Sequence, residues 1–548
     1  MTNQIIDVAI VGGGVSGVYT AWRLLTKDPG RDIAVFEDSD HIGGRLLSVQ
    51  PPNISDMVAE LGGMRILPAV QPRIAALLYA LNSQLGPDDQ IETYPFPVDE
   101  DVNIAFLRGT YLRLSDFTKD PKRVPYHLSW IEHGQTSGAI ITNGIKQIVP
   151  GITDPGLSDD QRREMAQSAV FDGEPLYKQG FWNVLSRVIS QEAYQLGIDA
   201  GGYETVLSNW NAADAIPWFL SDFGVSPVYR GFKKGFQIVP LTLQTLVENA
   251  GGRIVLNSRL VSFEWDLASS LFTLHIVGQD PIQARSLILA MPRRALELID
   301  SSLLKDNRVQ SLVKSVTPRP LFKIFTTYSN PWWTSAGVEA GRSVTDLPVR
   351  QTYYWPKDDG SPATSGRAML MASYDDGQNI GYWDGYRDKR GRGWRSEADP
   401  VQARRLFSGA DDQSRNDSTE WNNYPAPARM VQEVTRQLGL LHGLTYTPEV
   451  FSAAYRDWGD DPFGGGWNSW NIGAKSWEVK HEITQPYSED TGGALPFYIC
   501  GEAYSDAQGW VEGALQTADY VLEKLGIPPL PADPSVERED PQGLTRLS

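Results

Sequence analysis

The first forty residues follow a pattern of apolar runs and glycines that predicts a β-α-β unit. Residues 5–11 (IIDVAIV) form a nearly continuous apolar run that ends in glycines, as a buried parallel strand does. The stretch from Val15 to Leu25 predicts a helix, and Ile33 to Glu37 predicts a second strand. A strand, helix and strand in this order within about thirty residues form the βαβ motif.

The rest of the chain mixes predicted strands with a long helical region. Residues 120–235 have a helical pattern, and 510–525 predicts one more helix. Residues 377–425 are polar and charged and predict a surface insertion, while the proline-rich, acidic tail from Pro528 predicts disorder. Apolar runs predict further strands at 253–256, 260–265, 272–277, 286–290, 323–328, 351–355, 368–374 and 497–500.

The glycines after the first strand fit the GxGxxG pattern of a dinucleotide site. Gly12 allows the tight turn, Gly14 lets the backbone approach a pyrophosphate, and Gly17 lets helix and strand pack closely. The helix that follows offers free N–H groups to phosphates. Glu37, twenty residues after Gly17, can accept hydrogen bonds from a ribose. The alternative is a glycine-rich turn without a ligand, but the position between strand and helix favours nucleotide binding.

Two further features favour a flavin over a nicotinamide dinucleotide. A second glycine-rich turn with an arginine, at 41–45, suits a longer dinucleotide with more phosphate to neutralise. No second GxGxxG occurs between a strand and a helix, which favours a flavin reduced by its own substrate. The predicted strand 497–500 leads through Gly501 and Glu502 to the helix that starts near Trp510. Its N-terminus would stabilise negative charge on a reduced flavin, unless it is an ordinary edge helix.

Composition and charge exclude several classes of protein. The 548 residues suffice for three to five units of about 100–200 residues, and 41% hydrophobic with 21% charged residues is typical of a globular chain. The net charge of −18 argues against binding to nucleic acids or anionic membranes. No apolar run of about 18 residues and no secretory leader are seen, so we expect a cytoplasmic protein without membrane helices.

Cysteine and histidine usage predicts neither disulfides nor a metal site. Cys500 is the only cysteine, and the six histidines are scattered without the spacing of paired ligands.

Taken together, the motifs resemble the flavin amine oxidase superfamily and, within it, the L-amino-acid oxidase branch. The resemblance rests on VAIVGGGVSG with the later Phe36-Glu37, on Gly43-Gly44-Arg45, on ELGGMR at 60–65 and on YICGEAYSDAQGWVEGAL at 498–515. The Gly-Met-Arg step indicates the L-amino-acid oxidase branch, because amine and polyamine oxidases usually lack this arginine. The similar segments are 5–67, 230–328, 344–376 and 455–525.

The resemblance implies a mixed α/β fold and FAD bound without a covalent link. A Rossmann-like FAD-binding domain (1–67, 235–318 and 490–527) would be interleaved with a mixed-sheet substrate-binding domain (68–120 and 319–489) and a helical domain (121–234), with a flexible tail at 528–548. We expect a homodimer or higher homo-oligomer. The residues implied in cofactor binding are Gly12, Gly14, Val15, Ser16, Gly17, Glu37, Gly44, Arg45, Gly62, Gly63, Met64, Arg65, Leu260, Gly501, Glu502, Trp510, Val511 and Ala514.

The resemblance also implies the substrate-binding residues. Arg65 would bind the substrate carboxylate in bidentate fashion through its planar, permanently charged guanidinium. The Tyr374 hydroxyl would bind the same carboxylate. Lys323 would be catalytic and hold a water at flavin N5. The structural alternatives are an ion pair of Arg65 with Glu60, a solvated Tyr374 on its strand and an edge-strand Lys323.

The remaining substrate contacts are expected from aromatic and acidic residues. Trp467, Gly509 and Trp510 would form a wall around the amine. The family's substrate-facing histidine has no match, because no histidine occurs between 134 and 274. Residues 218–223 occupy roughly that region, where Asp222, Asp214 or Trp218 would contact the substrate side chain. An Asp222 that faces the pocket would favour basic side chains, and the alternative for each aspartate is an exposed position in a loop.

The predicted activity is that of an FAD-dependent L-amino-acid oxidase. It would convert L-amino acids to 2-oxo acids and ammonia and reduce O2 to H2O2. The alternatives are an amino-acid 2-monooxygenase, an amine or polyamine oxidase, and a flavin-binding interaction protein without turnover.

Overall fold

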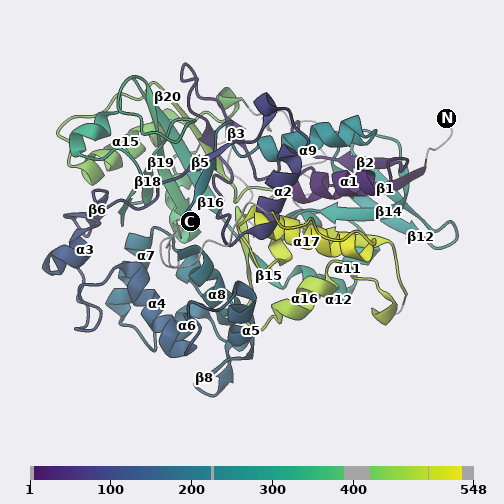
Figure 1. Ribbon diagram of the computed structural model, residues 1–548, viewed down its shortest axis with the longest axis horizontal. Helices are drawn as coiled ribbons and strands as arrows, with labels where there is room; N and C mark the ends of the chain where they lie inside the picture. The colour runs from purple at the N-terminus through teal and green to yellow at the C-terminus, as the bar shows by residue number, and fades with distance from the viewer. Residues whose placement is uncertain (1–4, 224–227, 388–419, 492, 534–548) are drawn as a thin grey trace, which may run out of the picture.

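Two seven-stranded sheets and a group of helices make up the computed structural model, which describes residues 5–223, 228–387, 420–491 and 493–533 (Figure 1). The first sheet has the order β11-β2-β1-β14-β13-β12, and β22 also pairs with β14. Its strands are β1 (Ile5–Val11), β2 (Ile33–Phe36), β11 (Arg253–Val255), β12 (Leu260–Asp266), β13 (Leu271–Ile276), β14 (Ile282–Ala290) and β22 (Phe497–Cys500).

The central strands of this sheet are parallel and buried on both faces. β1 pairs in parallel with β2 and β14, and β22 continues the parallel set. Parallel strands need crossover helices, and α1 (Val15–Lys27) packs against α17 (Val511–Lys524) and α9 (Ile238–Asn249). Figure 1 shows the purple α1 beside the yellow α17, although almost the whole chain separates them in sequence. The predicted β-α-β unit and the mixed α/β class are confirmed.

The second sheet has the order β20-β16-β19-β18-β17-β6-β7. Its pairs are antiparallel except for the parallel β17 and β6. The strands are β6 (Ile104–Leu107), β7 (Thr110–Arg113), β16 (Leu321–Tyr328), β17 (Arg342–Thr345), β18 (Gln351–Tyr354), β19 (Ala368–Asp376) and β20 (Ser452–Asp457), and α15 (Ala428–His442) lies beside β19 and β6.

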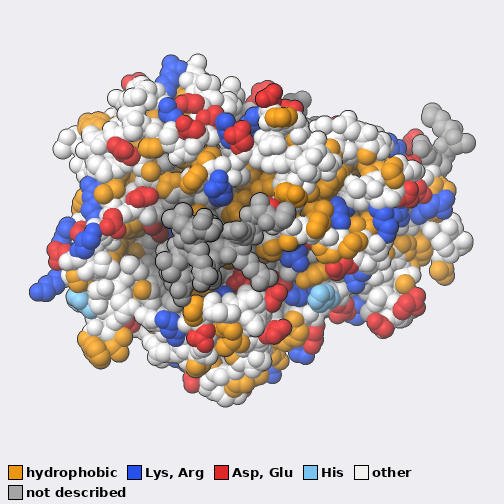
Figure 2. All heavy atoms as spheres, viewed as in Figure 1, with side chains coloured by type: hydrophobic (Ala, Val, Ile, Leu, Met, Phe, Trp, Pro, Cys, Tyr) orange, Lys and Arg blue, Asp and Glu red, His pale blue; other side chains and the backbone are white. Residues whose placement is uncertain are grey.

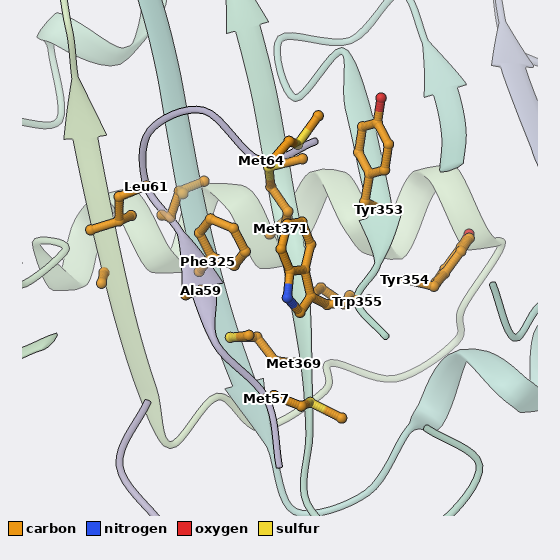
Figure 3. Close-up of a cluster of buried hydrophobic side chains, with 14 of the residues drawn as sticks. Met57, Ala59, Leu61, Met64, Phe325, Tyr353, Tyr354, Trp355, Met369 and Met371 are labelled. Carbon is orange, nitrogen blue, oxygen red and sulfur yellow. The ribbon is translucent and has the colours of Figure 1, made fainter. Parts of the chain in front are cut away.

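The segment that contains ELGGMR lies against the second sheet. Figure 3 shows Met57, Ala59, Leu61 and Met64 in one buried cluster with Phe325 and Trp355. The Trp355 Nε1–H donates to the Val58 carbonyl (2.7 Å), and the Trp458 Nε1–H donates to the Leu61 carbonyl (2.7 Å). This packing fixes the backbone immediately before Arg65.

The helices that follow β7 in the chain form a third group, whose buried side chains share one cluster (Figure 1). It contains α4 (Ser137–Ile148), α5 (Asp159–Ser168), α6 (Phe181–Leu185), α7 (Gln191–Gly201) and α8 (Ala212–Phe223). The three-part domain division predicted above remains a proposal. The shorter elements are β3 (Ser48–Val49), β4 (Ala59–Glu60), α2 (Pro72–Asn82), β5 (Thr93–Pro95), α3 (Asp116–Lys119), β8 (Val170–Phe171), β9 (Glu174–Pro175), β10 (Arg230–Phe232), α10 (Arg293–Glu297), α11 (Ser302–Lys305), α12 (Asn307–Val313), β15 (Val316–Arg319), α13 (Gly381–Asp384), β21 (Trp467–Trp470) and α16 (Ser476–Glu482).

The prediction of a surface insertion at 377–425 is wrong for its two described ends, residues 377–387 and 420–425. Ile380 and Trp383 are fully buried, and Trp421 and Tyr424 are nearly so. These side chains join the core of the second sheet, where the Trp383 ring stacks on Phe322. Residues 388–419 of that prediction, and the tail from 534, lie outside the described residues.

The surface carries both signs of charge. Figure 2 shows Lys and Arg side chains interspersed with Asp and Glu over the visible face. Across the described part of the chain, no helix combines the length and the apolar character needed to cross a bilayer.

Candidate active site

A cavity of about 1010 Å³ runs between the two sheets. At one end it is lined by the glycine turn after β1, and at the other by Arg65, Tyr374 and Trp467. Its volume is at the top of the range of about 300–1,000 Å³ that is typical of small-molecule and cofactor sites. The cavity therefore has room for a large ligand.

The glycine turn packs α1 tightly against the sheet. A Cβ on Gly12, whose φ is +110°, would lie 2.3 Å from the Ala290 carbonyl oxygen, and a Cβ on Gly17 would lie 1.9 Å from that of Gly12. Gly12 and Gly14 line the cavity, as predicted. Gly17 is not among the described lining residues; its role is to let helix and strand approach, rather than to contact a ligand.

The start of α1 offers free donors to an anion. Gly14 is its N-cap, and the first N–H groups of a helix have no partner within the helix itself. Val15 and Ser16 line the cavity. Free N–H groups and the positive end of a helix dipole suit a phosphate.

Glu37 follows β2 and faces the same end of the cavity. Its Oε2 accepts from the Gly13 N–H (2.5 Å), and its Oε1 accepts from the Ser39 N–H (2.9 Å) and hydroxyl (2.8 Å). Burial raises the pKa of Glu37 overall, although these hydrogen bonds act to lower it. Leu260, at the start of β12, lines the same cavity, and the role of these residues in binding adenosine stays a prediction.

Arg45 and Glu502 form an ion pair at the middle of the cavity. Arg45 Nη2 lies 2.9 Å from Glu502 Oε2, and its Nη1–H donates to the Gly466 carbonyl (3.0 Å). Glu502 also accepts from the N–H groups of Asn468 (3.0 Å) and Gly509 (2.6 Å). Both charged residues line the cavity, but each is already held by the other, which the sequence motifs did not reveal.

A second helix N-terminus and a glycine pair complete this part. α17 starts directly after Trp510, and Val511 and Ala514 line the cavity. A Cβ on Gly62 would lie 2.1 Å from the Arg45 carbonyl oxygen, so the Gly62-Gly63-Met64 backbone runs against the Gly44-Arg45 turn. Two helix N-termini and closely packed glycine backbones along one elongated cavity fit a dinucleotide such as FAD.

Lys323 lies inside the second sheet, on β16 between β20 and β19. It is buried, and its Nζ donates to the carbonyls of Gly62 and Glu60 (3.1 Å to Glu60). Burial lowers the pKa of Lys323, Glu60 raises it and Arg65 lowers it, and the net change is downward. The alternative of an edge-strand lysine is therefore wrong.

Arg65 is buried at the far end of the cavity, and its Nη1–H donates to the Tyr353 hydroxyl (3.1 Å). No described carboxylate lies within ion-pair distance. Glu60, the alternative partner, accepts from the Ser48 hydroxyl (2.6 Å) and the Phe236 N–H (2.6 Å) instead. Burial acts to lower the pKa of Arg65, but the surrounding tyrosines and Asp222 raise it overall, so the side chain keeps its charge.

Aromatic side chains line the end of the cavity that contains the Arg65 side chain. Trp218 stacks on Trp467 (5.5 Å, 16°), and its Nε1–H donates to the Gln508 carbonyl (2.7 Å). The Tyr374 ring meets Tyr203 edge-on (5.4 Å) and lies 4.9 Å from Lys323 Nζ. Gly509 and Trp510 also line the cavity. Tyr203, Val206 and Leu321 line it too, and no sequence motif marked them; Phe223, from the predicted segment 218–223, also lines it.

The two aspartates of α8 have different surroundings. Asp222 is buried and lines the cavity, and its Oδ1 accepts from the Tyr229 hydroxyl (3.0 Å). Burial raises the pKa of Asp222, whereas Arg65 and Tyr229 lower it. Asp214 is not among the described lining residues and accepts from the Ser476 hydroxyl (2.6 Å). Of the two, only Asp222 remains a candidate for substrate contact.

Similar proteins include enzymes and proteins named without an activity. Aplysianin-A of Aplysia kurodai is 28% identical over 98% of this chain and 93% of its own, and achacin of Lissachatina fulica is 25% identical over 95% and 93%. L-amino acid oxidase Bs29 of Bothriechis schlegelii is 24% identical over 68% and 69%.

A solved structure shares the fold. Putrescine oxidase bound to putrescine has a TM-score of 0.63 at 15% identity, and the match covers 95% of this chain and 99% of that one. The family model of flavin-containing amine oxidoreductases matches residues 15–395, which is well over half of the chain. The chain therefore belongs to the flavin-containing amine oxidoreductase family and is an FAD-dependent oxidoreductase that acts on amine donors.

Proposed function

We propose that the protein is an L-amino-acid oxidase that releases 2-oxo acid, ammonia and H2O2. The observation that carries this proposal is Arg65, a buried cation that lines the cavity with no described carboxylate in ion-pair distance. A buried charge without a direct ion-pair partner is unfavourable unless a ligand supplies one. A substrate carboxylate supplies that neutralisation, and a simple amine does not.

The residues of the chain orient the substrate. Arg65 binds the carboxylate through its N–H groups, and the Tyr374 hydroxyl shares it. Trp467 and Trp510 enclose the amine, so that the Cα hydrogen faces the flavin. A flavin held by the glycine turn after β1 and the start of α17 would supply the redox chemistry, which is uptake of a hydride and electron transfer to O2. Orientation of this kind contributes several kcal/mol, up to about 7–11 in favourable cases.

Lys323 has the geometry to hold a water beside the flavin. Two carbonyl oxygens, of Glu60 and Gly62, accept from its ammonium group. In its protonated form the amino group has three donors, so one remains for a water in the cavity that Lys323 lines. Burial lowers the pKa of Lys323 to about 7, and the neutral amine would accept from that water instead. The same hydrogen bonds fix the backbone two and four residues before Met64.

We further propose that FAD is held without a covalent bond. The lone cysteine, Cys500, is buried at the end of β22, and burial raises the pKa of its thiol to about 12. A protonated, buried thiol is a poor nucleophile. Cys500 is also absent from the described residues that line the cavity.

A peroxide assay with L-amino acids, D-amino acids and primary amines tests the proposal. We expect H2O2 with L-amino acids alone, and equal amounts of 2-oxo acid and ammonia. Peroxide with amines but with no amino acid would instead identify an amine oxidase. An amide and carbon dioxide as products would identify an amino-acid 2-monooxygenase, and no reaction with any donor would favour an interaction protein.

A further inference from the structure

The Arg65 guanidinium is covered on one face by Tyr229. Arg65 Cζ lies 4.0 Å from the centre of the Tyr229 ring, whereas the rings of Phe96 and Tyr353 are about 6 Å away. Arg65 and Asp222 line the cavity, but Tyr229 is not among the described residues that do so. Tyr229 therefore supports the guanidinium without reaching the ligand space.

Main-chain hydrogen bonds fix Tyr229 beside Arg65. The next residues of the two segments, Ile66 and Arg230, form an isolated antiparallel bridge in which each N–H donates to the other's carbonyl (3.0 Å each). On its other side, the Tyr229 carbonyl accepts from the Phe96 N–H (2.9 Å). The stacking contact is thus set by the backbone and does not depend on two freely rotating side chains.

The Tyr229 hydroxyl attaches the ring to α8. Its single O–H donates to Asp222, and the hydroxyl oxygen lies 3.0 Å from both the Oδ1 and the carbonyl oxygen of that residue. Asp222 lies in the last turn of α8, so one side chain joins the Arg65 segment to the helix that carries part of the cavity wall. These contacts fix the plane of the ring, and with it the plane of the guanidinium.

Stacking and edge hydrogen bonding use different parts of an arginine. A ring against the planar face gains cation–π attraction and leaves the N–H groups at the edge free for a carboxylate. Holding a long side chain in one orientation before the substrate arrives also removes the entropy cost of ordering it on binding.

We propose that Tyr229 is a positioning residue for Arg65: its ring, held by Asp222 and by the Ile66–Arg230 bridge, sets the guanidinium plane for carboxylate binding. The inference rests on the proposed function, in which Arg65 binds a carboxylate. It adds a residue that no motif of the sequence marks.

Binding of benzoate, a carboxylate without an amine, tests this in the flavin-loaded protein. The dissociation constant is measured from the change in the flavin absorption spectrum. We expect Tyr229→Leu to weaken benzoate binding about tenfold or more, since a desolvated cation–π contact is lost. Tyr229→Phe keeps the ring and loses the link to Asp222, and we expect about threefold weakening, in keeping with a net hydrogen bond.

Phe96→Leu is the matched control, because Phe96 is equally buried in the same core cluster but lies farther from Arg65. We expect it to change benzoate binding less than about twofold. Steady-state kinetics with an L-amino acid should show the same order in KM, with a much smaller change in kcat. A general loss of packing would instead lower the flavin content of both Tyr229→Leu and Phe96→Leu. The protein that keeps its flavin would then bind benzoate as the wild type does.

Wild-type binding of benzoate by Tyr229→Leu would overturn the proposal. If that variant loses its flavin, Tyr229→Phe decides, and binding equal to the wild type overturns it. A wild-type protein that oxidises amines and ignores both benzoate and amino acids contradicts the proposed function itself. The two failures are therefore distinct.

Discussion

Arg65 is the residue on which substrate selection depends. It is a buried cation that donates to the neutral Tyr353 hydroxyl and has no described carboxylate as partner. We expect Arg65→Ala to raise the KM for L-amino acids strongly, because a buried charged contact is commonly worth about 2–5 kcal/mol. The measurement is steady-state oxidation, and an unchanged KM would exclude Arg65 from the substrate site.

Asp222 gives a separate prediction about the substrate side chain. Its carboxylate lines the cavity close enough to Arg65 to affect the pKa of that residue. We expect Asp222→Asn to lower kcat/KM for L-lysine relative to L-leucine by about tenfold, the effect of roughly 1.4 kcal/mol. Any indirect effect through Tyr229 and Arg65 acts on both substrates and cancels in the ratio. An unchanged ratio would show that Asp222 does not contact the side chain.

Single residues were predictable where a motif ties them to local backbone geometry. Gly12, Gly14 and Arg65 belong to such motifs, and all three line the cavity. Tyr229 and Asn468 were not found, because their contacts with Arg65 and Glu502 join segments far apart in sequence. Such contacts arise from tertiary packing, and a single sequence carries no local signal for them.

The packing of α1 on the first sheet is the element on which cofactor binding depends. A methyl group at Gly17 would lie 1.9 Å from the Gly12 carbonyl oxygen. We expect Gly17→Ala to push α1 away from the phosphate turn and to reduce the flavin content of the purified protein, measured as the ratio of visible to ultraviolet absorption.

The matched control is Gly138→Ala in α4, because a Cβ there meets no atom within 4 Å. Alanine favours a helix over glycine by about 1 kcal/mol, so this variant should keep its flavin. Full flavin content in Gly17→Ala would contradict the packing role given to that residue.

Strands were predicted well where the apolar run is buried on both faces. β1 and β22 match their predicted bounds, and β16 and β19 extend by two residues beyond theirs. β17 was missed because its sequence, RSVT, is mostly polar although all four residues are buried. In that strand Arg342 reaches the Asp99 carboxylate (2.8 Å), so tertiary partners and not hydrophobicity explain its burial.

At the scale of the whole molecule, the cavity forms where segments distant in sequence meet. The glycine turn, the ELGGMR segment, β16 and the start of α17 all contribute to its lining. The sequence indicated each segment by its motif. Their arrangement around one cavity was implied by the resemblance and not by spacing, because chain distance says little about which elements pack together.

His442 links the stability of the fold to pH. It is buried at the end of α15, with Nε2 2.8 Å from the Tyr354 hydroxyl and Nδ1 2.8 Å from the Leu438 carbonyl. Burial lowers the pKa of His442 to about 4. In the unfolded chain a histidine titrates near 6.5, so its stabilising contribution is present above about pH 6.5 and is lost as the pH falls toward 4.

We expect this loss to reach about 2 kcal/mol at pH 5, from roughly 1.5 pKa units at 1.36 kcal/mol each. His442→Gln removes the titration, so its unfolding free energy should fall less between pH 7 and pH 5 in urea denaturation. His133→Gln, at an exposed histidine, should behave as the wild type does. Equal pH dependence of His442→Gln and wild type would refute the assignment.

Anaerobic mixing of the flavin-loaded protein with an L-amino acid is the most direct test of the central claim, which is that Arg65 selects amino acids by their carboxylate. We expect the yellow flavin to bleach with the L-amino acid, to keep its colour with the corresponding decarboxylated amine, and to bleach far more slowly in Arg65→Ala at the same L-amino acid concentration. Bleaching by the amine but not by the amino acid would contradict the claim.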